Sequence, residues 1–122
     1  MDEARDDLES AVLLRNGGKH AKACFMAQQA AEMALKAALY SRLRESRTHV
    51  LKMLVTDLDK AAPETVLECA RVLDNYYIPT RYANGHDSGA PHLHYGPLQS
   101  EQAIEYAGVL IEFARSRMAG TR

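Results

Sequence analysis

Apolar residues recur every three or four positions along most of the chain, in segments separated by glycine, proline or polar residues. This spacing places the apolar side chains on one face of a helix, whereas no segment shows the alternation that is typical of a strand. The pattern predicts an all-α fold, an antiparallel up-and-down four-helix bundle with one additional short helix. The expected helices cover about residues 2–15, 19–43, a short stretch that starts near 48, 63–77 and 100–118.

Helix-breaking residues mark the expected boundaries. Asn16, Gly17 and Gly18 end the first helix, because asparagine and glycine adopt the left-handed conformation that closes helices. Pro63 is expected near the first position of the fourth helix, and Ser100 is expected to cap the last one. Between the fourth and last helices, residues 83–97 are rich in glycine, proline and histidine, which predicts a long loop.

Composition limits the possible function classes. A chain of 122 residues fits one domain, 1–122, and its net charge of −1 argues against broad non-specific binding to nucleic acid. Cys24 and Cys69 lie in apolar helical patterns and are expected to be buried thiols in a reducing compartment. No apolar run is long enough to span a bilayer, so we expect a cytoplasmic protein.

A polar stripe interrupts the alanine-rich second helix. Gln28, Glu32 and Lys36 are spaced four residues apart and therefore share one helical face. Glu32 is flanked by apolar neighbours, and a buried carboxylate needs a partner because desolvation of an unpaired charge is costly. The stripe is a candidate ligand-binding surface; the alternative is a solvated helix edge.

A second candidate segment follows the fourth helix. Pro79 ends the helical pattern, so Arg81 and Tyr82 are expected in a shaped loop. A guanidinium can hold a carboxylate through two hydrogen bonds and still offer donors to a phosphate, which makes Arg81 the expected partner of Glu32. His49, at the start of the third helix, is expected to cap that helix or to pack against the same cleft.

The histidines raise the question of catalysis. Arg81 and His86 have four residues between them, a spacing that sets a phosphate-binding cation beside a general acid or base. Two other Arg–His pairs, 15/20 and 44/49, share the spacing, so it is a weak signal. The nearby histidines of the loop lack a third clustered ligand, and we predict neither a metal nor a cofactor.

Two stretches together resemble the HEPN domain, a small helical family that is similar to the C-terminal domain of kanamycin nucleotidyltransferase. They are Ala23 to Lys36 and Leu73 to Tyr82, with His49 between them at the head of a leucine-containing helix. The resemblance covers nearly the whole chain and implies a helical bundle that forms a homodimer. It also implies work beside a separate minimal nucleotidyltransferase, with nucleotide binding or, in some branches, RNA cleavage as a toxin.

The ribonuclease branches of that family use an Arg-x4-6-His motif that is frequently followed by x-Tyr. Arg81 and His86 fit the spacing, while Ser88 stands where the tyrosine would be. Two hypotheses therefore remain. The first is a nucleotide- or phosphate-binding module whose cleft is lined by Gln28, Glu32, Lys36, His49, Arg81 and Tyr82. The alternative is a metal-independent endoribonuclease toxin of a toxin-antitoxin pair, with Arg81 and His86 as catalytic residues.

Overall fold

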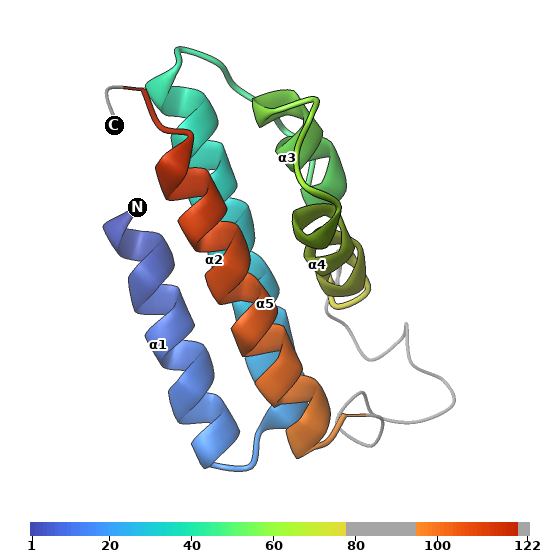
Figure 1. The fold of residues 1–122 in the computed structure, drawn as a ribbon. Helices are drawn as coiled ribbons and strands as arrows, with labels where there is room; N and C mark the ends of the chain where they lie inside the picture. The colour runs from blue at the N-terminus through green and yellow to red at the C-terminus, as the bar shows by residue number, and fades with distance from the viewer. Residues whose placement is uncertain (78–94, 120–122) are drawn as a thin grey trace.

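The computed structural model describes residues 1–77 and 95–119, which form five α-helices and no strand. The prediction of an all-α bundle is confirmed. The helices, coloured from blue to red in Figure 1, are α1 (Asp2–Asn16), α2 (His20–Ser41), α3 (Leu51–Leu58), α4 (Glu64–Asp74) and α5 (Pro97–Ser116).

The four longer helices alternate in direction along the chain, and α3 is the additional short one (Figure 1). The helix α2 contacts all the others and is the central element. Contacts at both ends hold α2 and α5 side by side and parallel. His20 Nδ1 lies 2.9 Å from Ser100 Oγ at their first turns, and the backbone N–H of Ala119 donates to Ser41 Oγ at 2.9 Å beyond their last turns.

The core is built on the alanine-rich face of α2, where small side chains let the neighbouring helices approach closely. Larger apolar groups from α3, α4 and α5 fill the remaining space, with Leu51, Leu73 and Leu110 fully buried. Cys24 and Cys69 are buried free thiols, as expected. Burial raises the pKa of Cys24 to about 11, so this thiol stays protonated and unreactive at neutral pH.

Two predicted helix starts were wrong. The third helix begins at Leu51 and not near Thr48, so His49 precedes the helix and does not cap it. Ser100 does not cap α5, because that helix already begins at Pro97. Ser100 is instead fully buried within the first turns of α5, where its hydroxyl contacts the ring of His20.

Smaller shifts affect the fourth helix. Pro63 is its N-cap rather than its first residue, and the helix ends at Asp74 instead of continuing to the two following tyrosines. Most of the predicted loop at 83–97 lies outside the described residues; its last residue, Pro97, already belongs to α5. Within the described ranges, no helix combines the length and the hydropathy needed to cross a bilayer.

Candidate functional site

The polar stripe predicted on α2 lies against the neighbouring linker and is largely shielded from water. Gln28 is fully buried and Glu32 is only 7% exposed. Gln28 Nε2 donates to Glu32 Oε1 at 3.2 Å, and Lys36 Nζ lies 3.0 Å from Glu32 Oε2. The spacing of four residues therefore produces one connected network, with Glu32 at its centre.

His49 completes this network from the linker between α2 and α3. Its Nδ1 lies 2.7 Å from Glu32 Oε2, and its ring stacks on Tyr77 with centroids 4.7 Å apart and an interplanar angle of 13°. Gln29 adds two further hydrogen bonds, from its Nε2 to Gln28 Oε1 at 2.7 Å and to Glu32 Oε1 at 3.4 Å. The His49 ring is thus fixed by a carboxylate at one edge and by an aromatic face.

The electrostatics of the network keep Glu32 ionised. Burial alone would raise its pKa, but hydrogen bonds from Lys36, His49 and Gln28 together outweigh burial and lower it. An ionised carboxylate only accepts hydrogen bonds, so Nδ1 of His49 must carry the proton that it donates. In the neutral ring, Nε2 is then the unprotonated nitrogen, and it has no partner among the residues that the structure describes.

Asp74, the last residue of α4, positions the segment that carries His49. Its Oδ1 accepts a hydrogen bond from the backbone N–H of Leu51 at 2.7 Å, and its Oδ2 accepts one from Lys52 at 3.3 Å. Both N–H groups lie at the start of α3 and have no partner within the helix, so Asp74 acts as the cap of a helix distant in sequence. Burial raises the pKa of Asp74, these backbone hydrogen bonds oppose that rise, and the negative charge of Glu32 adds to it.

Two shallow hollows flank the stripe, and Lys36 and Tyr40 line both. One, of about 440 Å³, lies between α2 and the N-terminal residues of the chain and reaches Gln29 and Glu32. The other, of about 300 Å³, lies between α2 and residues 44–47 of the linker. Lys36 therefore connects the buried carboxylate with two surface openings.

Four of the predicted ligand-binding residues, Gln28, Glu32, Lys36 and His49, come together in this network. Arg81, Tyr82 and His86 lie outside the described residues, so the predicted contact between Arg81 and Glu32 is not described. Where the chain is described, Glu32 is paired with Lys36 and His49.

The sequence analysis did not single out Gln29, Asp74 or Tyr77 as members of this site. Gln29 lies one residue away from the spacing of four that revealed the stripe. Asp74 and Tyr77 bind groups more than twenty residues away in sequence, on the linker and α3. The only local signal for these two was their place at the end of a helical pattern.

Comparison with known proteins identifies the family. The model of the HEPN domain matches residues 1–117. The chain belongs to the HEPN domain family. Functionally curated proteins give no match to this HEPN domain.

Solved structures agree with this assignment. The HEPN domain described here is 39% identical to TT1696 from Thermus thermophilus, covers 96% of its own length and 94% of that chain, and superposes with a TM-score of 0.88. For ST0689, an archaeal HEPN homologue, the identity is 33%, the coverages are 94% and 91%, and the TM-score is 0.80. A HEPN domain protein (tm0613) from Thermotoga maritima is 30% identical, with coverages of 93% and 92% and a TM-score of 0.73.

Proposed function

We propose that this HEPN domain is a nucleotide- or phosphate-binding module that works beside a separate minimal nucleotidyltransferase. The observation that carries the proposal is the network around Glu32. Its buried carboxylate has two partners that reach the surface of the protein. The side chains of His49 and Lys36 are 49% and 30% exposed, so both offer groups to a ligand.

The charges of the network suit an anionic ligand. Lys36 balances the charge of Glu32, and its partly exposed ammonium can donate hydrogen bonds to an anion. Hydrogen bonds from an ammonium to phosphate oxygens are charge-assisted and therefore strong. The buried carboxylate then serves to hold Lys36 and His49 in place, and the ligand binds to the outward side of Lys36.

Association with other chains is part of the proposal. Large apolar side chains remain exposed on α1 and α5, with Leu13 71%, Leu98 74% and Val109 39% exposed. Such residues support a homodimer, which sedimentation equilibrium tests directly. Co-purification from the native host tests for the nucleotidyltransferase.

Isothermal titration with ATP, AMP and inorganic phosphate tests the binding function. We expect heat of binding from wild-type protein and a loss of affinity of about tenfold in Lys36→Met, because a charged hydrogen bond to phosphate is removed. Lys22→Met is the matched control, since Lys22 is an exposed lysine of the same helix and lies about 21 Å from Lys36 along its axis. Absence of heat at millimolar ligand would contradict the proposal.

The same protein preparations address the alternative function. Incubation with RNA separates a binding module from an endoribonuclease that uses Arg81 and His86. Cleavage by wild-type protein and not by His86→Ala would favour the enzyme. We expect no cleavage by either.

A further inference from the structure

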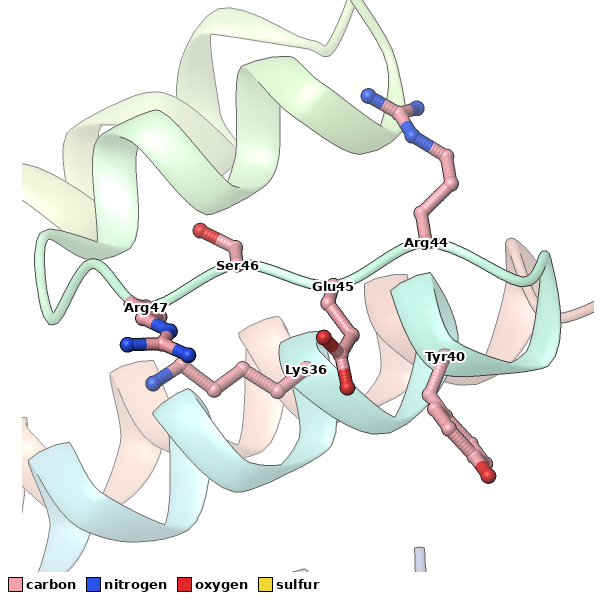
Figure 2. Close-up of a pocket in the computed structure, with 6 residues that line it drawn as sticks. All are labelled: Lys36, Tyr40, Arg44, Glu45, Ser46 and Arg47. Atoms are coloured by element: carbon pink, nitrogen blue, oxygen red, sulfur yellow. The ribbon is translucent and has the colours of Figure 1, made fainter.

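The linker between α2 and α3 follows a fixed path across the surface of α2. Leu43 adopts a φ of 60°, a left-handed conformation that is rare for leucine and reverses the chain just after α2. Arg44 then donates from Nη1 to the carbonyl oxygen of Asp57 at 2.7 Å, which fastens the linker to the last turn of α3. The following residues therefore pass close to α2 and enclose the hollow of about 300 Å³ (Figure 2).

Two cations come together at one end of this hollow. Figure 2 shows the guanidinium of Arg47 beside the ammonium of Lys36, while the side chain of Arg44 points away toward α3. Arg47 has no hydrogen bond or ion pair with any residue that the structure describes, and the carboxylate that binds Lys36 is shared with His49. Neighbouring like charges repel one another, so an anion that bridges Lys36 and Arg47 would be stabilised by both.

Tyr40, an exposed aromatic residue, also lines this hollow. Tyr40 follows Lys36 by one helical turn on α2, and it is 69% exposed. In Figure 2 the carboxylate of Glu45 lies between the two cations at one end and Tyr40 at the other. A phosphate is therefore favoured at the end formed by Lys36 and Arg47, and it is repelled near Glu45.

We propose that this linker hollow is the site where the ligand binds, and that the ligand is a nucleoside phosphate. The phosphate lies between Lys36 and Arg47, and the base stacks on Tyr40. The inference rests on the proposed function and specifies where and how the ligand binds. An aromatic face accepts any base, because every base presents a planar π surface, so Tyr40 contributes affinity without selecting a base.

Isothermal titration of three variants tests the site with ATP, AMP, pyrophosphate and adenosine as probes. Arg47→Met is expected to weaken ATP and pyrophosphate binding about tenfold, because it removes a charged donor. Tyr40→Ala is expected to weaken AMP binding about tenfold and to leave pyrophosphate binding unchanged, because only stacking is lost. Tyr40→Phe should retain AMP binding, and adenosine should bind far more weakly than AMP to wild-type protein.

The control is Arg71→Met, since Arg71 is a half-exposed arginine of α4 that pairs only with glutamates of its own helix among the residues described. All the altered side chains are exposed or half-exposed, and circular dichroism checks that each variant is folded. Loss of binding in Lys36→Met with full binding in Arg47→Met and Tyr40→Ala would overturn the linker site and leave the proposed function standing. A wild-type protein that binds no probe would overturn both.

Discussion

Glu32 and Asp74 are two shielded carboxylates that both bind the segment leading into α3, but they bind different kinds of partner. Asp74 accepts hydrogen bonds from backbone N–H groups of α3. Glu32 accepts them from the side chains of residues on α2 and on the linker, His49 and Lys36 among them. Backbone groups of a helix have fixed positions, whereas side chains with exposed ends remain available to a ligand.

The pKa values of the two carboxylates are also shifted in opposite directions. Glu32 is surrounded by donors that favour its charged form, and its pKa is lowered. For Asp74, burial and the nearby charge of Glu32 outweigh two backbone hydrogen bonds, and the pKa is raised. Asp74 is therefore a helix cap whose ionisation is disfavoured, while Glu32 is the ionised centre of the network that we propose for ligand binding.

The largest expected effect is that of Glu32→Ala. The substitution removes the acceptor of the buried Gln28 amide and the partner of Lys36 and His49, which should lower the free energy of unfolding by about 2–3 kcal/mol. Urea denaturation measures this change. Nucleotide binding should also be lost, because the two donors are no longer held in place.

Glu68→Ala is the control for this variant, since Glu68 is an exposed residue of α4 that pairs with Arg71. Its effect on the free energy of unfolding should stay below about 1 kcal/mol, as is usual for surface ion pairs. Equal effects of the two substitutions would show that Glu32 is only a surface charge.

Asp74→Ala is expected to lower the free energy of unfolding by less than Glu32→Ala does, because it removes a helix cap and not the centre of the polar network. Loss of a helix cap costs about 1 kcal/mol of stability, and α3 is a short helix that depends on this cap. Binding should weaken only moderately, because His49 precedes α3 and keeps its contacts with Glu32 and Tyr77. Asp74→Asn keeps an acceptor oxygen and should recover part of the stability; a complete loss of binding in Asp74→Asn would contradict a purely structural role.

The longer helices and the start of α3 differ in how well the sequence predicted them. The helices were found because apolar spacing is a local property, and the glycine break after α1 was correct. The start of α3 was misplaced because its cap, Asp74, comes from a distant helix and leaves no capping signal beside Leu51. Serine is a preferred N-cap residue, so Ser100 was expected to cap α5, yet its hydroxyl is buried against His20 of α2.

The candidate site also contains residues that the sequence predicted and residues that it did not. The stripe of Gln28, Glu32 and Lys36 was visible because residues four apart share a helical face. The bond between His49 and Glu32 depends on the path of the linker, which residue spacing does not encode. Arg47 was missed for the same reason, since only the reversal at Leu43 brings it to Lys36.

The pH dependence of stability should run in opposite directions for the two carboxylates. The lowered pKa of Glu32 means that its ionisation stabilises the fold above its ordinary value of 4.5, and this contribution is lost as the pH falls through the lower folded value. The raised pKa of Asp74 means that ionisation costs stability as the pH rises from the ordinary 3.8 through the folded value.

Urea denaturation of wild-type protein, Glu32→Gln and Asp74→Asn between about pH 3 and pH 7 measures both signs. The stability advantage of wild-type protein over Glu32→Gln should shrink toward acid pH. Its advantage over Asp74→Asn should grow toward acid pH. If the stability differences of the two variants from wild-type protein changed with pH in the same direction, the proposed difference between the two carboxylates would be wrong.

The smallest effect is expected from a third carboxylate, Asp59, which extends the comparison to a surface ion pair. Its Oδ2 lies 2.8 Å from Nη2 of Arg117, whose guanidinium also lies 4.5 Å from the centre of the Phe113 ring. This pair joins the turn after α3 to the end of α5, and water screens it because both side chains are partly exposed. Asp59→Asn should therefore lower the Tm only slightly, less than Asp74→Ala does, and leave nucleotide affinity unchanged by titration. A loss of affinity in Asp59→Asn would mean that binding depends on the whole α3 end of the bundle, and the contrast between a capping carboxylate and one that positions ligand-binding side chains would fail.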